Sequence, residues 1–199
     1  MGCLKKIIGL IIFIFAIIGF VSVGGMQFVM EKIDKFVNPT PEIVRLKSAT
    51  VADFSKIPKG YELTKAYDVF GYKAVMAEKD GNDQKILVID TQNKLKLTQK
   101  DFQTGDAALK VKKLLDNNLS PLDVENLDNV QKSSIRGFGR TIPYIKFDAT
   151  VKGLPFKKVE AIAGVVDAKE NPLLILSYAE QGKFDKNVTE VFLKNVRMK

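Results

Sequence analysis

The chain carries few side chains of the types that commonly perform catalysis. It has no histidine, and its single cysteine is Cys3. A domain without these side chains has no imidazole base, no thiol nucleophile and no Cys/His zinc site. Ser133, Ser134 and Ser177 lie in strand-like segments, and none is part of a Gly-x-Ser-x-Gly motif. We therefore expect no catalytic residue, metal or cofactor. The enzymatic alternative is a secreted or anchored hydrolase that uses carboxylates or a serine–lysine pair.

Two arginines and two glycines around Phe138 form the pattern that best suits a ligand. Glycines let neighbouring backbone N–H groups converge on a phosphate or carboxylate, and guanidinium groups add charged donors. We predict an anion-binding site at this segment, with two lysines as neighbours. The alternative is a hairpin whose glycines only form the turn. The candidate residues are Arg136, Gly137, Gly139, Arg140, Lys157 and Lys158.

Acidic and aromatic side chains suggest two further sites. Four carboxylates precede the arginine segment, but their spacing differs from that of an EF-hand calcium loop, so we expect a solvated loop there. Aromatic residues in the strand-like segments are candidates for a contact face, although core packing explains most aromatics in strands. The acidic residues are Asp116, Asp123, Glu125 and Asp128; the aromatic residues are Tyr61, Tyr67, Tyr72, Phe138 and Tyr144.

The elements that must position these residues are mostly strands. β-branched and aromatic residues bounded by turn residues are typical of strands. Asp80-Gly81-Asn82-Asp83 predicts a tight hairpin turn, and the strongly apolar run 173–176 predicts a central strand. The expected strands are 61–70, 72–79, 85–90, 124–136, 141–151, 159–168 and 173–179.

Three helices complete the pattern of the globular part. Thr98 resembles the cap of a short helix, and apolar residues at helical spacing predict a second helix from Asp106 up to Asn117-Asn118. Asp185 resembles the cap of a last helix that runs through Met198. This order predicts an α+β domain with a mostly antiparallel sheet of about seven strands and helices packed on it.

The element order resembles the Mog1/PsbP-like fold group over roughly residues 53–197. The resemblance includes Pro58-Lys59-Gly60-Tyr61 before the first strand and the ending LLILSYAEQGKFDKNVTEVFLKNV. It implies a non-enzymatic binding or assembly module, of a kind often exported or associated with membranes. The group shares no catalytic residues, so the resemblance assigns none here. The chain departs from simple members in its apolar N-terminal segment and its long polar region at 116–136.

Residues 7–30 contain no charged side chain, and Lys5 and Lys6 precede them. A helix of this length covers roughly 36 Å, enough to cross the ~30 Å hydrocarbon core of a bilayer. The alternative is a cleaved signal peptide, although the apolar core is longer than the ~7–15 residues usual for one. We predict an N-terminal membrane anchor helix at 1–36, a juxtamembrane linker at 37–52 that two prolines keep extended, and the α+β domain at 53–199.

The charge pattern indicates an orientation and a class of partner. The two lysines before the apolar segment favour a cytoplasmic N-terminus and a domain outside the cytoplasm, although later basic residues leave the reverse orientation open. The formal net charge is +8, and the chain has no motif typical of nucleic-acid binding. We expect a single-pass membrane protein, held in the lipid bilayer through residues 7–30, whose domain binds an envelope protein or an anionic polymer or surface.

Overall fold

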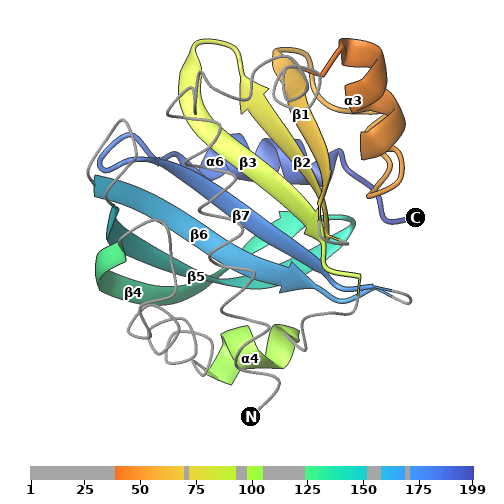
Figure 1. Ribbon diagram of the computed structural model, residues 1–199. Helices are drawn as coiled ribbons and strands as arrows, with labels where there is room; N and C mark the ends of the chain where they lie inside the picture. The colour runs from red at the N-terminus through yellow and green to blue at the C-terminus, as the bar shows by residue number, and fades with distance from the viewer. Residues whose placement is uncertain (1–38, 70–71, 93–97, 105–123, 152–157, 169–170) are drawn as a thin grey trace.

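The computed structural model describes residues 39–69, 72–92, 98–104, 124–151, 158–168 and 171–199. Seven strands form one antiparallel sheet in the order β1-β2-β3-β7-β6-β5-β4 (Figure 1). The strands are β1 (Tyr61–Val69), β2 (Tyr72–Lys79), β3 (Asn82–Asp90), β4 (Val124–Gly137), β5 (Arg140–Val151), β6 (Lys158–Val166) and β7 (Leu173–Glu180). The described helices are α3 (Pro41–Ser48), α4 (Gln99–Thr104) and α6 (Lys186–Lys194).

The predicted antiparallel sheet of about seven strands with accompanying helices is therefore confirmed. The sheet consists of two meanders, β1 to β3 and β4 to β7, which join where β3 pairs with β7. Strand β7 lies in the middle of the order, as its apolar sequence predicted, and Leu173 to Ala179 are all buried. The predicted turn at Asp80-Gly81 is also confirmed, since Lys79 pairs with Asn82 and Gly81 has a φ of 68°.

One face of the sheet is covered by α3 and α6. Helix α3 packs against β1 and β2, whereas α6 reaches β4 at the other edge. Phe192 of α6 is fully buried, and its ring centroid lies 5.7 Å from that of Tyr61 and 6.2 Å from that of Phe54. The Tyr61 hydroxyl also donates a 2.8 Å hydrogen bond to the carbonyl of Val188. The first strand and the last helix therefore share one core.

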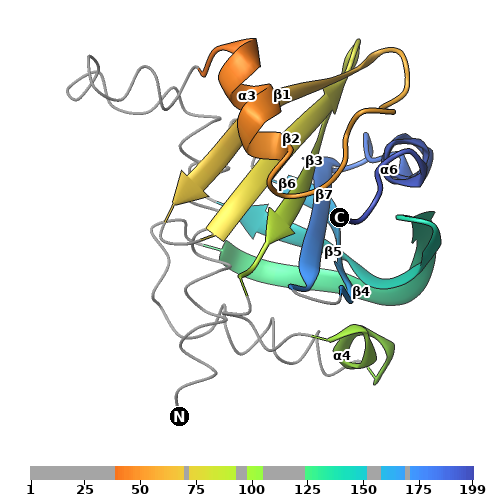
Figure 2. The ribbon, with the colours of Figure 1, turned by 90° about the vertical axis from the view of Figure 1, so that its right-hand side faces the viewer.

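The opposite face of the sheet is also apolar and buried, as Leu87, Leu176 and Tyr178 show. Helix α4 contacts β5 and β6, and the carbonyl of its Gln103 accepts a 3.4 Å hydrogen bond from the Nζ of Lys132. Helices α3 and α4 lie at opposite ends of the described structure in both views (Figures 1 and 2). The predicted helix from Asp106 up to Asn117-Asn118 lies outside the described residues.

Helix α3 corrects the expectation of an extended spacer after the two prolines. Thr40 caps the helix, because its hydroxyl accepts a hydrogen bond from the N–H of Ile43, and Pro41 stands in the first turn. Proline is compatible with that turn, where its missing N–H would have no intrahelical partner. Val44 is buried against the sheet. This part of the 37–52 segment is therefore packed on the domain.

Helix α6 begins as predicted but ends earlier. Asp185 is its N-cap and accepts a 2.8 Å hydrogen bond from the N–H of Asn187. The helix ends at Lys194 rather than Met198, because Arg197 leaves it to form a β-bridge with Asp53. Two backbone hydrogen bonds of 3.0 and 3.1 Å hold that bridge. The chain end is thereby attached to the segment that follows α3.

The predicted membrane segment at 7–30 lies outside the described residues. Among the helices that the structure describes, none has the length and apolarity that a membrane crossing requires.

Candidate functional site

The predicted anion-binding segment forms the turn between β4 and β5. Phe138 and Gly139 have φ values of 53° and 73°, as in the two-residue turns that match strand twist. The Phe138 side chain is buried, and its N–H donates a 2.9 Å hydrogen bond to the carbonyl of Leu193 in α6. A Cβ on Gly137 would lie 2.6 Å from the Cβ of Leu193. The glycine at 137 thus allows α6 to approach, and the N–H of Phe138 is already bonded.

The cationic residues of this prediction are only partly brought together. The Nη1 of Arg140 donates a 2.8 Å hydrogen bond to the carbonyl of Asp167. Arg136 pairs with Thr141 and Arg140 with Gly137, so the two arginine side chains leave opposite faces of the hairpin. Lys158 pairs with Thr150 at the other end of β5, roughly 30 Å along the strand from Arg140. Lys157 lies outside the described residues, and anion binding at the hairpin stays a prediction.

Ser177, one of the serines considered for catalysis, belongs to a buried polar cluster. Its hydroxyl donates to the carbonyl of Lys85 at 3.0 Å and accepts hydrogen bonds from Thr189 at 2.8 Å and from the side-chain amide of Gln84 at 3.0 Å. Gln84, Ser177 and Thr189 are all fully buried. These neutral partners hold the hydroxyl inside the core, where it joins β3, β7 and α6. Ser133 and Ser134 are exposed on β4.

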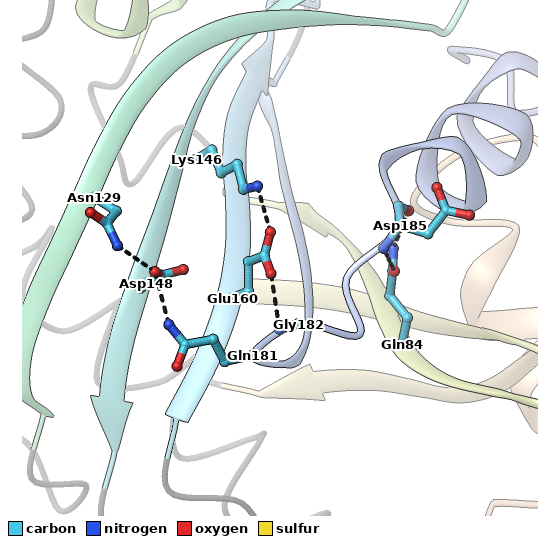
Figure 3. A network of polar contacts seen from close by, with 8 residues as sticks. All are labelled: Gln84, Asn129, Lys146, Asp148, Glu160, Gln181, Gly182 and Asp185. Carbon is cyan, nitrogen blue, oxygen red and sulfur yellow. Dashed lines mark hydrogen bonds and ion pairs between the residues drawn. The ribbon is translucent and has the colours of Figure 1, made fainter.

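A polar hollow of about 280 Å³, the Asp148 hollow, lies where β5 and β7 end and β6 begins. The Asp148 carboxylate accepts hydrogen bonds from Asn129 at 2.7 Å and from Gln181 at 3.0 Å (Figure 3). Beside it, the Nζ of Lys146 lies 2.5 Å from Glu160, and hydrogen bonding to Glu160 raises the pKa of Lys146. The hollow is lined by Asp128, Asn129, Asp148, Ala149, Thr150, Lys158 and Gln181.

A second hollow of about 380 Å³, the Asp90 hollow, lies at the opposite end of the sheet, where β3 ends. Its walls come from the residues after α3, from Ala168 and Asn171 between β6 and β7, and from Met198 and Lys199. The Asp90 side chain accepts hydrogen bonds from the N–H and the side-chain amide of Gln92. The lining residues are Thr50, Val51, Asp90, Ala168, Asn171, Leu173, Met198 and Lys199.

The other predicted sites receive less support from the structure. Within the described ranges, no three His, Cys, Asp or Glu side chains are grouped so as to hold a metal ion. Of the acidic run, only the side chain of Asp128 is described, and it is exposed. Tyr61, Tyr67, Phe138 and Tyr144 are buried, so these aromatic residues contribute to the core rather than to a contact face.

Sequence reasoning missed the Asp90 hollow. The available signal was an acidic residue at the end of the apolar run Ile86–Ile89, but nothing in the sequence indicated what would surround it. No protein-family model and no curated protein matches the chain. The resemblance to the Mog1/PsbP-like group therefore stays a prediction.

Proposed function

We propose that this protein is a membrane-anchored, non-enzymatic binding module whose α+β domain lies outside the cytoplasm and contacts an anionic membrane surface. The supporting observation is Leu46 on the outer side of α3. Its side chain is 61% exposed, compared with 44% for Val191 and 39% for Val130, the other exposed large apolar residues of the described chain. Single exposed apolar residues are common on proteins, so the proposal depends on where Leu46 lies and not on its exposure alone.

Helix α3 follows the predicted membrane segment closely. The apolar segment ends at Met30 and α3 begins at Pro41. An extended chain spans at most ~3.6 Å per residue, so residues 31–40 reach no further than roughly 36 Å. With residues 7–30 in the bilayer, α3 must stay within that distance of the membrane surface. The part of the domain that carries Leu46 is thus tethered within reach of lipid.

The charges around α3 fit an anionic surface. Arg45, beside Leu46, is exposed. Arg197 and Lys199 are exposed as well, and the bridge between Arg197 and Asp53 holds them near the segment that follows α3. Basic residues close to anionic lipid contribute about 1 kcal/mol each. An apolar side chain among basic residues is typical of contacts at a membrane interface, where the apolar group enters the headgroup region.

A single fluorescent label on α3 tests this contact. With Cys3→Ser as background, Leu46→Cys provides one thiol for an environment-sensitive dye on the full chain. We expect the emission to shift to the blue in vesicles of phosphatidylcholine containing phosphatidylglycerol, and the shift to decline as salt is added, because salt screens surface charge. The matched control is Val130→Cys on β4, at the other edge of the sheet. A shift that is equal in pure phosphatidylcholine, or equal at Val130, would contradict the proposal.

The location of the domain needs a separate measurement. A tag after Lys199 and protease treatment of intact spheroplasts will show on which side the domain lies. We expect external protease to digest the domain and the untreated chain to retain its full mass. Protection in intact spheroplasts, with digestion after lysis, would place the domain in the cytoplasm. A shortened mature chain would indicate cleavage of the apolar segment.

A further inference from the structure

Asp90 is a buried carboxylate whose bonding partners are neutral. Asp90 is 5% exposed, and both of its hydrogen bonds within the described part of the chain come from Gln92, two residues further along. Lys73 stands directly opposite Asp90 in the register of β2 and β3, but the described residues show no ion pair between them or with any other cation. Burying an ionised carboxylate costs several kcal/mol unless an opposite charge offsets the loss of hydration. An additional cationic partner would therefore stabilise this site.

Several more exposed carboxylates of the domain do have a lysine. Glu78 is paired with Lys85, and Glu160 with Lys146, each at 2.5 Å. Glu190 is paired with Lys194 at 2.8 Å. Asp90 differs from these three carboxylates in two ways. It is more buried, and no lysine among the described residues is bonded to it. What distinguishes its surroundings is the hollow that it lines.

The Asp90 hollow has the size and lining of a site for a small molecule. Its volume of about 380 Å³ lies within the ~300–1,000 Å³ usual for ligand pockets. Val51, Leu173 and Met198 provide apolar walls, whereas Thr50 and Asn171 provide polar groups. A ligand that fits this lining carries one positive charge for Asp90 and a short aliphatic chain for the apolar walls.

We propose that the Asp90 hollow binds a small aliphatic amine in its ammonium form, with the Asp90 carboxylate as counter-charge. The ammonium group donates to the carboxylate, and the alkyl chain lies against Leu173 and Met198. A charged donor suits this position, because hydrogen bonds between ions are about twice as strong as those between neutral groups. This site is independent of the predicted membrane anchor, so it stands whichever side of the membrane the domain occupies.

Calorimetric titration of the full chain in a non-ionic detergent tests the site. The probe is 5-amino-1-pentanol, which carries one positive charge, and its neutral counterpart 1,5-pentanediol has the same length without the charge. We expect the amino alcohol to bind at least about tenfold more tightly than the diol, since a charge-assisted hydrogen bond contributes enough for that ratio. Asp90→Asn should reduce the affinity for the amino alcohol by a similar factor. Asp148→Asn, in the other polar hollow, should leave it unchanged.

A second variant covers the case in which Asp90→Asn fails to fold. Thr50 is exposed at the rim of the hollow, so Thr50→Trp should block the hollow without altering the core, and binding of the amino alcohol should be lost. Equal binding of the amino alcohol and the diol would overturn the proposal, as would full binding by Thr50→Trp. Lys199 also lines the hollow. Binding of the amino alcohol that appears only in Lys199→Gln would overturn the proposal too, by showing that the chain's own ammonium group occupies the site.

Discussion

Gln84 and Asp185 exchange two hydrogen bonds between the third strand and the cap of the last helix. The backbone N–H of Asp185 donates to the Oε1 of Gln84 at 2.8 Å, and the Nε2 of Gln84 donates to the carbonyl of Asp185 at 3.1 Å (Figure 3). The same amide reaches Thr189 at 2.8 Å. One buried side chain thus fixes where α6 begins relative to the sheet.

The first prediction concerns this glutamine. Gln84→Leu removes the amide and leaves the buried hydroxyls of Ser177 and Thr189, and the backbone groups of Asp185 at the start of α6, with fewer partners. Each buried group left unsatisfied costs about 1–3 kcal/mol, so we expect a loss of about 2–4 kcal/mol in the free energy of unfolding. Gln131→Leu, on an exposed position of β4, is the matched control and should change stability by less than about 0.5 kcal/mol. Chemical denaturation of the full chain, followed by near-ultraviolet circular dichroism, gives both values; equal losses would contradict this role for Gln84.

The second prediction separates the two glycines of the β4–β5 turn. Gly137→Ala places a Cβ 2.6 Å from Leu193 and 3.1 Å from Ile142, so the turn and α6 must move apart. We expect a loss of about 1–3 kcal/mol, the usual range for overpacking. At Gly139 a Cβ would meet nothing within 4 Å, and the φ of 73° is one that asparagine tolerates. Gly139→Asn should therefore be close to neutral in the same denaturation experiment. A near-neutral Gly137→Ala would show that α6 does not depend on this close approach.

Those features that depend on neighbouring residues could be predicted from the sequence. The hairpin at Gly81 follows from its turn residues, and the central position of β7 follows from an apolar run that suits burial on both faces. The cap of α6 by Asp185 is local as well. Helix α3 was missed because two prolines favour extended chain, whereas Pro41 stands in the first turn, where proline is tolerated.

The candidate sites were harder to predict, because they depend on which distant segments meet. Asp90 and Leu173 are paired across β3 and β7, and Met198 approaches them from the chain end. No spacing in the sequence indicates that convergence. At the arginine hairpin the sequence did not indicate a packing role. The structure uses Gly137 and Phe138 to pack against α6, and anion binding there stays a prediction.

The third prediction concerns stability at alkaline pH. Burial raises the pKa of Tyr67 above its ordinary value of 10.0, and the negative charge of Glu78 raises it further. The folded state thus keeps a proton that the unfolded state loses above pH 10. The stability that this pKa difference gives the folded state is fully present below about pH 10. It is lost as the pH rises toward the pKa of Tyr67 in the folded state. The free energy of unfolding should fall by up to about 1.4 kcal/mol per pH unit for this group.

Tyr67→Phe is the variant that measures this effect, because phenylalanine has no ionisable hydroxyl. Denaturation between pH 9 and pH 11.5, conditions chosen around the ordinary tyrosine pKa of about 10, should give a shallower decline for the variant than for the unaltered chain. Tyr61→Phe is a useful comparison, since burial and then Asp185 raise the pKa of Tyr61 as well. Parallel declines in the unaltered chain and Tyr67→Phe would show that Tyr67 does not keep its proton in the folded state.

The fourth prediction distinguishes a structural arginine from an anion-binding one. Arg140 donates to the carbonyl of Asp167 and so connects the β4–β5 turn to the end of β6. Arg136 is exposed. The pKa of Glu190 is lowered mainly by its hydrogen bond with Lys194, and the positive charge of Arg136 lowers it slightly further. Arg140→Gln should therefore cost about 1 kcal/mol of stability. Arg136→Gln should cost less than about 0.5 kcal/mol, as is usual for a surface charge.

Repeating these denaturation experiments in inorganic phosphate tests the anion-binding prediction at the same residues. If the hairpin bound phosphate, the bound anion would stabilise the folded state, and both arginine variants would lose that stabilisation. The two guanidinium groups leave opposite faces of the hairpin, and the N–H of Phe138 is bonded to Leu193. The expected phosphate effect is therefore small and equal in all three chains. A stabilisation present only in the unaltered chain would mean that the arginines converge on an anion when one is available.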